Sequence, residues 1–385
     1  MTDKPQFDGQ GVKLGDVATY INGYAFKPAD YSLNGKQIIR IQDLTGNAYQ
    51  TNNFAGELDD KYLVSSGDVL ISWSASLGVF EWNKEEAWLN QHIFKVVFNK
   101  LPVDKRYFIH QARYVINKGA MLAHGATMRH LTKKVFESLP FSYPNRSEQL
   151  TIAKRLDDIQ RQIYLAEKQI SKLDSLVKSR FVEIFGDFAC YETKPLIKCV
   201  DCIEAGKSPK CLAFSRKMAE PGVLKLSAIS SGVYCENENK ALPRSVSLTI
   251  DKVVHANDIL LSRKNTPELV GRSVLVKHTD GNIMFPDIIF RMHPLPPINA
   301  MYLSYLLAGP LLHSIQSLAH GSAKSMSNIP KSELAKLSIP IPALNLQNEF
   351  ANFVSQVDKS RFVAQQQIEK LQMLYDSLAQ EYFGD

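Results

Sequence analysis

The clearest pattern of apolar and polar positions in this chain is a heptad repeat that occurs in two separate segments. In each segment, apolar residues recur at alternating steps of four and three, the spacing that keeps one narrow seam against a partner helix. At ~1.5 Å per residue, the first segment, 150–185, predicts a helix about 54 Å long. The seam residues of the first segment are Ile152, Leu156, Ile159, Ile163, Ile170, Leu173 and Val177, with the small residue Ala166. Those of the second are Phe350, Val354, Val357, Ile368, Leu371, Tyr375 and Leu378, with Ala364, interrupted by Arg361.

Two arrangements of these helices satisfy the pattern. Each could pack on its own globular domain, or the two could pair with each other; the narrow seams of equal length favour an antiparallel pair. The prolines of 140–144 and 340–342 predict an extended approach to each helix. We expect Asn145 or Ser147 to cap the first helix and Asn345 the second.

The chain also contains an internal repeat, mostly at a shift of 198 residues, which predicts one scaffold used twice with different surfaces. The matching pairs are 139–144 with 337–342, Gln149 with Gln347, 185–187 with 383–385, 123–125 with 319–321, 67–72 with 257–262, and 93–96 with 289–292. We predict domains at 1–149 and 188–346, a central helix at 150–187, and a further helix at 347–385.

The globular parts mix helical and strand patterns, so the predicted fold class is α+β: two mixed α/β domains related by the repeat and joined by two long antiparallel coiled-coil helices. The expected strands are 37–42, 69–73, 93–98, 223–226, 258–262, 273–276 and 288–292. The expected domain helices are 104–122 and 299–318, the second interrupted at Gly309-Pro310.

Composition restricts the function without identifying it. Hydrophobic residues at 45% and charged ones at 22% are typical of a globular protein. No run of 18 apolar residues and no secretory apolar region is present, so we expect a cytoplasmic protein with no membrane partner. The net charge is +6; segment 188–346 has 18 basic and 12 acidic residues, whereas 347–385 has 3 and 6. This surplus permits nucleic-acid binding but does not require it.

Familiar catalytic motifs are missing from the sequence. It has neither a GxxxxGK[ST] phosphate loop nor the Asp-Pro-Pro-Tyr or Asn-Pro-Pro-Phe tetrapeptides of amino-methyltransferases. Cys199 and Cys202 have metal-ligand spacing, but no second pair completes a tetrahedral zinc site. Asp287 lacks a following Glu-X-Lys, so we interpret it as a strand-edge carboxylate, and His124 and His320 as helix C-terminal residues. We therefore expect no catalytic residue, metal or cofactor in this chain.

Several segments together resemble the specificity subunit of type I restriction–modification systems. They are 222–229 followed by 238–243, 13–17, 38–43, the proline-rich approaches, Gln149 and Gln347, and the two Phe-Gly-Asp endings. The resemblance covers nearly the whole chain. It implies two target recognition domains that each read one half of a bipartite double-stranded DNA site, with the helices setting the spacer. It also implies two modification subunits, which bind S-adenosylmethionine and methylate adenine, and restriction subunits, which need ATP and Mg.

Basic residues of the two globular domains are the candidate DNA contacts, because Arg and Lys bind phosphates and base edges. Segments 206–210 and 262–265 are predicted to be exposed basic loops. The candidates are Arg40, Arg129 and Lys133 in the first domain and Lys207, Lys210, Arg263, Lys264, Arg272 and Lys324 in the second. For each, the alternative is a solvated surface charge. Two other functions stay open: a coiled-coil scaffold that binds proteins without DNA specificity, and a fused enzyme that modifies DNA itself.

Overall fold

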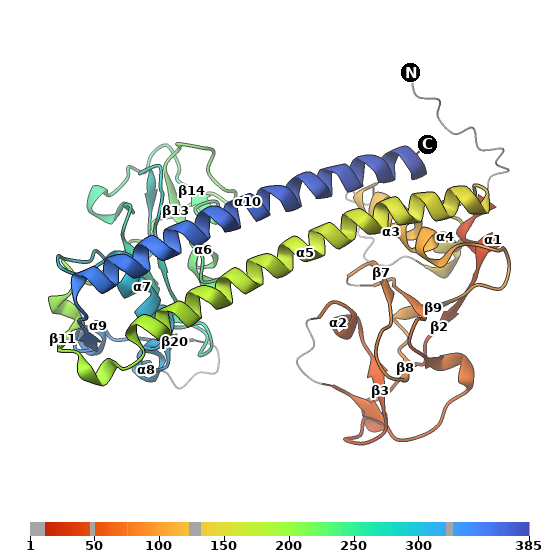
Figure 1. The fold of residues 1–385 in the computed structure, drawn as a ribbon, viewed down its shortest axis with the longest axis horizontal. Coiled ribbons are helices and arrows are strands. Elements are labelled where there is room, and N and C mark those ends of the chain that lie inside the picture. The colour runs from red at the N-terminus through yellow and green to blue at the C-terminus, as the bar shows by residue number, and fades with distance from the viewer. Residues whose placement is uncertain (1–11, 47–50, 75, 123–131, 321–325, 385) are drawn as a thin grey trace. The chain divides into compact units, whose positions relative to one another are not determined.

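The computed structural model describes residues 12–46, 51–74, 76–122, 132–320 and 326–384 (Figure 1). The chain divides into two compact units. Unit 1 comprises residues 1–169 and 364–385, and unit 2 comprises residues 170–363. Two long helices, α5 (Arg146–Phe185) and α10 (Leu344–Phe383), each contribute residues to both units. Both begin a few residues before the predicted starts at 150 and 347.

Unit 1 contains a main four-stranded antiparallel sheet and a smaller mixed sheet. The main sheet has the order β2 (Thr19–Asn22), β9 (Ile93–Val97), β6 (Val69–Ser72), β7 (Gly78–Glu81). The mixed sheet has the order β4 (Asn53–Phe54), β3 (Lys36–Ile39), β8 (Ala87–Leu89), β5 (Leu63–Val64), with β3 and β8 parallel. A separate pair joins β1 (Val12–Lys13) to β10 (Pro140–Phe141). The helices are α1 (Leu14–Val17), α2 (Ile41–Leu44), α3 (Lys105–Leu122) and α4 (Lys133–Glu137).

Unit 2 has the same kinds of sheet. Its main antiparallel sheet has the order β12 (Glu204–Ala205), β19 (Ile289–Met292), β15 (Ile259–Ser262), β17 (Ser273–Leu275). Its mixed sheet has the order β14 (Asn239–Ala241), β13 (Gly222–Leu224), β18 (Ile283–Met284), with β13 and β18 parallel. Two pairs are separate: β11 (Thr193–Pro195) with β21 (Ser338–Pro340), and β16 (Lys264–Asn265) with β20 (Ser327–Asn328). The helices are α6 (Ser227–Ser230), α7 (Ala300–Ala308), α8 (Leu312–Ser317) and α9 (Lys331–Ala335).

Corresponding turns in the two units are built in the same way. Gly67 before β6 and Asn257 before β15 both have positive φ, +91° and +70°. This left-handed region strains most side chains but suits glycine and tolerates asparagine. The next residue, Asp68 or Asp258, accepts a hydrogen bond from the backbone three residues earlier, at 2.9 and 2.7 Å. Two different sequences therefore form one turn.

Both long helices are attached to their unit by a buried glutamine. Gln149 accepts a hydrogen bond from the Asp104 amide at 2.8 Å and donates to the Pro144 carbonyl at 2.9 Å. Gln347 accepts from the Asn299 amide at 2.8 Å and donates to the Pro342 carbonyl at 2.8 Å. Because each buried amide finds backbone partners on both sides, it fixes the start of the long helix against the domain helix.

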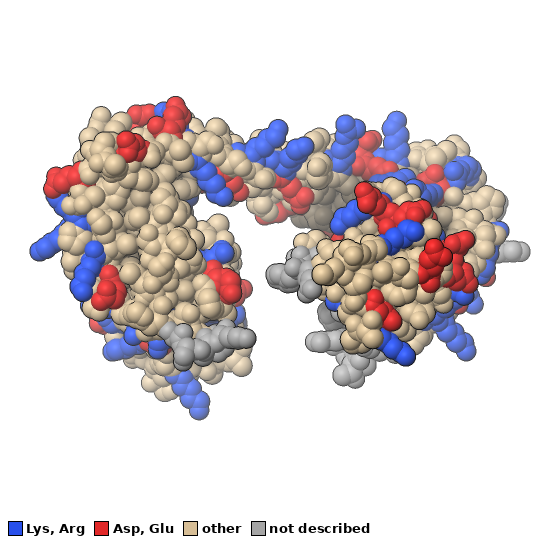
Figure 2. Space-filling model, turned by 90° about the horizontal axis from the view of Figure 1, so that it is seen from below, with Lys and Arg blue, Asp and Glu red and all other residues tan. Residues whose placement is uncertain are grey.

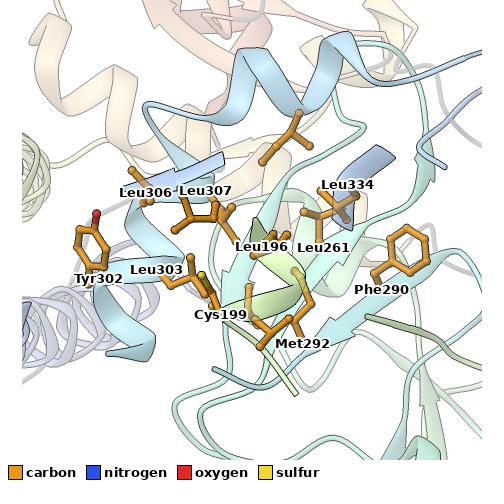
Figure 3. Close-up of a cluster of buried hydrophobic side chains, with 14 of the residues drawn as sticks. Leu196, Cys199, Leu261, Phe290, Met292, Tyr302, Leu303, Leu306, Leu307 and Leu334 are labelled. Atoms are coloured by element: carbon orange, nitrogen blue, oxygen red, sulfur yellow. The ribbon is translucent and has the colours of Figure 1, made fainter. Parts of the chain in front are cut away.

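The central strand of each main sheet is buried on both faces. In β15, Leu261 packs into the core beneath α7, whereas Leu260 packs into a second cluster on the opposite face. Figure 3 shows Leu261 with Leu303, Leu306 and Leu307 of α7 in the first of these clusters. In β6, Ile71 and Leu70 divide between two clusters in the same way. Successive side chains point to opposite faces, so a strand covered on both sides is a continuous apolar run.

The long helices contact each other within each unit. In unit 1, Leu156 near the start of α5 shares a core with Tyr382 near the end of α10. In unit 2, Phe181 near the end of α5 lies beside Phe350 near the start of α10, with ring centroids 5.1 Å apart. The helices α5 and α10 therefore run antiparallel to each other in each unit. Every seam residue named from the heptads is buried or half-buried, and Arg361 bonds to Asp174 of α5 instead.

Several local expectations are corrected by the structure. The strand expected over 37–42 stops at Ile39, because the Asp43 carboxylate accepts the Arg40 amide at 2.7 Å and starts α2. The strand expected over 223–226 ends at Leu224 before α6. Asn345 is wrong as a cap, since α10 begins one residue before it.

Other local expectations concern helix ends and membrane crossing. Asn145 and Glu148 form reciprocal capping bonds of 3.1 and 3.2 Å at the start of α5. The helical stretch 299–318 breaks at Gly309, as expected. His320 lies beyond the end of α8, where its backbone pairs with that of Asn328. Its expected role at a helix C-terminus is therefore wrong. His124 lies outside the described residues. Among the described residues, no helix combines the length and apolarity that crossing a bilayer requires.

Candidate nucleic-acid interface

One end of the main sheet in unit 2 gathers four of the predicted basic residues. The strands β12 and β15 end here, and their antiparallel neighbours β19 and β17 begin here. The last residues of β12 and β15 therefore pair with the first residues of β19: Ala205 with Phe290, and Ser262 with Ile289. The loops that follow or precede these strands therefore lie together. They contain Lys207, Arg263, Lys264 and Arg272, which we call the basic sheet end.

The loop that carries Lys207 is held by close backbone contacts. The Lys207 amide donates to the Phe285 carbonyl at 3.0 Å, and a Cβ on Gly206 would lie 1.9 Å from that same oxygen. Ser208 hydrogen-bonds to the carboxylate of Asp287, whose amide donates back to the serine hydroxyl at 3.2 Å. Asp287 thus ties two loops together at the beginning of β19, and Lys207 itself is exposed.

The two arginines of the basic sheet end contact an aromatic ring and backbone carbonyls, none of which is charged. The Arg263 guanidinium lies 5.3 Å from the ring centroid of Phe290 and donates to the Asp287 carbonyl at 3.4 Å. Arg272 donates to the Ser230 carbonyl at 3.3 Å. Within the described part of the chain, no residue of the basic sheet end forms an ion pair, and neither does exposed Lys210. Their charges remain available to an anionic ligand such as a phosphate.

The structure does not assemble the predicted basic residues of unit 1 in the same way. Arg40 follows β3 in the mixed sheet, and its guanidinium lies 4.9 Å from the ring centroid of Tyr31. Lys133 belongs to α4 and pairs with Glu137 at 3.7 Å. Arg129 and Lys324 lie outside the described residues.

The corresponding end of the main sheet in unit 1 has a different composition, which residue-type reasoning missed. It consists of Tyr24, Trp73, Gln91 and His92, which we call the aromatic sheet end. These residues follow β2 and β6 and precede β9. The repeat of 67–72 with 257–262 was the signal that could have located them, because its next position pairs Trp73 with Arg263.

A buried polar cluster joins the domain helix α3 to both long helices in unit 1. His110 contacts the Asp157 carboxylate of α5 through Nε2 at 2.9 Å and the Tyr375 hydroxyl of α10 through Nδ1 at 2.9 Å. Arg106 also hydrogen-bonds Asp157, through Nε at 3.1 Å.

The charge states of this cluster follow from burial and hydrogen bonding. Burial lowers the pKa of His110 to about 4, outweighing the opposing effect of Asp157. Burial alone would raise the pKa of Asp157, but the hydrogen bonds from Arg106 and His110 lower it overall. At neutral pH an uncharged imidazole therefore bridges a charged carboxylate and a hydroxyl, an arrangement suited to fixing the helices.

The outer surface of the long helices presents large apolar side chains at repeated positions. Tyr164 and Leu165 in unit 1 are 59% and 52% exposed, and their counterparts 198 residues later, Phe362 and Val363 in unit 2, are 63% and 62% exposed. Leu176 in unit 2 and its counterpart Leu374 in unit 1 are 48% and 47% exposed. We call these two sets the exposed apolar helix positions.

Metal-binding chemistry is not supported by the described residues. They contain no group of three or more His, Cys, Asp and Glu side chains arranged to hold an ion. Burial, with the nearby Asp201 and Glu204, raises the pKa of Cys202 to about 11, so this thiol is protonated at neutral pH. In the face drawn in Figure 2, basic and acidic side chains are interspersed over both units.

Comparisons with known proteins agree with one another. Residues 8–175 match the family model described as the type I restriction modification DNA specificity domain. The chain is 22% identical to the type I restriction enzyme EcoBI specificity subunit of Escherichia coli, an alignment covering 90% of this chain and 78% of that protein. It is 34% identical to the EcoEI specificity subunit of the same species over 38% of this chain and 25% of that protein. The fold resembles the type I restriction–modification S subunit from M. genitalium, with a TM-score of 0.52, 13% identity, and coverage of 100% and 98%.

Proposed function

We propose that this chain, which belongs to the family of type I restriction–modification specificity subunits, recognises a bipartite site in double-stranded DNA. The globular parts 1–149 and 188–346 are the two target recognition domains, and each reads one half of the site. Specificity subunits are non-catalytic, so methyl transfer and cleavage belong to the modification and restriction subunits of the complex. S-adenosylmethionine, ATP and Mg are bound by those partners.

The observation that carries this proposal is that the two units share one sheet framework but carry different residues at the corresponding sheet ends. The main sheets of the two units have the same strand order, yet one ends in Lys207, Arg263, Lys264 and Arg272 and the other in Tyr24, Trp73, Gln91 and His92. Positively charged loops hold phosphates, while amide and guanidinium groups distinguish base edges. Two different surfaces on one framework suit two different half-sites.

The long helices are proposed to set the distance between the half-sites. Each contains 40 residues, about 60 Å at 1.5 Å per residue. Each supplies core side chains to both units, such as Leu156 and Phe181 of α5. Half-sites read from one side of DNA are separated by about 34 Å or a multiple of it. An antiparallel pair along the predicted seam would be stiff enough to act as that spacer.

The exposed apolar helix positions support docking of two copies of one partner. The same residue positions recur in unit 1 and unit 2, so one protein surface could bind each set in the same manner. Large aromatic and aliphatic side chains that stay exposed in the free protein are typical of interaction sites. We assign these positions to the two modification subunits.

Genome-wide mapping of N6-methyladenine in cells with and without this chain tests the function. The expected result is a single bipartite motif that disappears when the chain is removed. Replacing residues 1–149 by the corresponding domain of a relative should change one half of the motif and leave the other half and the spacer intact.

Two results would favour the competing functions. Methylation that is independent of this chain, with no sequence-dependent DNA binding by the assembled complex, would favour a protein-binding scaffold. Methyl transfer by the purified chain without partners would show that it is itself an enzyme.

A further inference from the structure

We propose that the aromatic sheet end is the surface with which unit 1 reads its DNA bases, and that Gln91 and His92 determine the sequence it prefers. This inference rests on the proposed function, because it names the reading residues of one domain. These residues are distinct from Arg40, Arg129 and Lys133, the basic residues expected from the sequence.

The first support is positional equivalence with the basic sheet end. Trp73 follows β6 as Arg263 follows β15. The Trp73 amide donates to the carbonyl of His92, just before β9, at 3.4 Å, and the Arg263 amide donates to the carbonyl of Ile288, just before β19, at 2.9 Å. Trp73 stacks on Phe94 with centroids 5.8 Å apart, as Arg263 lies over Phe290 at 5.3 Å. An indole thus replaces a guanidinium on the same aromatic platform.

The second support is that the loops are held in place before any ligand binds. The Tyr24 amide donates to the Leu89 carbonyl at 2.8 Å, and the Gln91 amide donates to the Tyr24 carbonyl at 3.0 Å. A Cβ on Gly23 would lie 2.1 Å from the Asn90 carbonyl oxygen, so this close approach requires glycine. Backbone bonds therefore position Gln91 and His92 without their side chains, which is the preorganisation that selective binding needs.

The third support is the chemistry of the exposed groups. Gln91 is half-buried, and His92 and Tyr24 are exposed. A glutamine amide can donate to and accept from an adenine edge at once, and imidazole and phenol groups hydrogen-bond to bases. Trp73 lies beside His92, with ring centroids 5.6 Å apart, and limits the orientations available to the imidazole.

The two sheet ends should therefore contribute differently to DNA binding. None of the four residues of the aromatic sheet end carries the permanent charge of Lys or Arg, so few counterions would be released when it binds. The basic sheet end carries four such charges. Unit 1 would supply base discrimination with weak salt dependence, and unit 2 would supply more of the phosphate attraction.

The test uses the full chain assembled with its modification subunits and a DNA library in which each half-site is randomised in turn. Gln91→Ala and His92→Ala should each reduce the preference for one or two bases in a single half-site by about tenfold, within the range of a good side chain–base contact. The other half-site and the slope of affinity against salt should not change. Gln91→Glu, which keeps the length but removes the donor, should shift the preferred base.

Asn83→Ala is the matched control, because this exposed asparagine follows β7 at the opposite end of the same sheet. It should leave both half-sites unchanged. If the three sheet-end variants assemble normally and retain the wild-type preference in both half-sites, the assignment of the aromatic sheet end is overturned. If the wild-type complex itself shows no bipartite preference, the proposed function fails instead.

Discussion

The two main sheets differ chiefly where their strands end. In unit 1, β6 and β7 are separated by residues 73–77, whereas in unit 2 β15 and β17 are separated by residues 263–272. The longer loop forms β16 and presents Arg263 and Lys264, while the shorter one leaves Trp73 stacked on the sheet. Strand order thus tolerates changes in loop length and charge, because the buried faces of the strands fix the framework independently of the loops.

The units also differ in how they hold the long helices. Unit 1 uses the polar cluster of His110, Asp157 and Tyr375. Unit 2 uses aromatic packing, in which Phe350 lies 5.1 Å from Phe181 and 5.2 Å from Tyr305. Apolar packing therefore attaches the helix ends in both units, and unit 1 adds a titratable network to it. This contrast predicts different responses to mutation and pH.

The largest effect should come from Phe350→Ala, because this ring is fully buried between α5 and α7 in unit 2. Truncating a buried phenylalanine costs about 3–5 kcal/mol. Hydrogen exchange should accelerate across 188–346 and remain slow in β6 and α3 of unit 1. Phe362→Ala, at a 63% exposed position of the same helix, is the control and should change stability little. Equal loss of protection in both units would contradict their separate packing.

Acid should destabilise unit 1 between about pH 6.5 and 4. The pKa of His110 falls from 6.5 to about 4 on folding, so the unfolded chain binds an extra proton in this window and stability is lost as the pH decreases. The full effect is about 3 kcal/mol, at 1.36 kcal/mol per pKa unit. His110→Gln should flatten this dependence, as measured by urea unfolding at a series of pH values. An unchanged pH slope in that variant would exclude His110 as the cause.

Substitutions at the exposed apolar helix positions should remove modification subunits one at a time. Tyr164→Ala with Leu165→Ala, and separately Phe362→Ala with Val363→Ala, should each weaken one of two docking sites by about 2 kcal/mol or more, as expected for an aromatic anchor. Native mass spectrometry would detect complexes with one modification subunit instead of two. Combining all four substitutions should leave the chain without either. Two bound subunits in every variant would place docking elsewhere.

The smallest effect should come from Arg263→Ala with Lys264→Ala. DNA binding should weaken, and the slope of log affinity against log salt should decrease by up to about two, near one for each phosphate that the variant no longer neutralises. Lys336→Ala, at an exposed position just after α9, is the control. Fluorescence anisotropy at several salt concentrations measures both quantities. An unaltered slope would remove this loop from the interface.

The parts of the fold that the sequence predicts well are those with long periodic signals. The heptads predict both long helices, and the repeat pairs Gln149 with Gln347, which make equivalent buried hydrogen bonds in the structure. The short helix α2 was missed because one carboxylate, on Asp43, ends a strand that β-propensity would continue. Such a side chain–backbone bond leaves no periodic pattern.

The candidate site was predicted less completely, for a different physical reason. Searching for positive charge finds Arg263 and Lys264, since phosphate binding depends on charge. It cannot find Gln91 or Trp73, whose significance comes from strand order and long-range pairing. Arg40 is the reverse case: its positive charge makes it a candidate, but it follows a strand of the mixed sheet and its guanidinium lies over the Tyr31 ring.

The composition of unit 1 from two distant stretches of chain has a consequence for synthesis. Residues 364–385 supply Ala379, Tyr382 and Phe383 to the core of unit 1, yet the ribosome adds them after all of unit 2. Unit 2 is continuous in sequence and can complete its core first, since domains fold as units during translation. The core side chains of unit 1 that these residues cover stay exposed until a loop of nearly two hundred residues closes. A chaperone that shields nascent chains would therefore act chiefly on the first domain to be made, which is the last to finish folding.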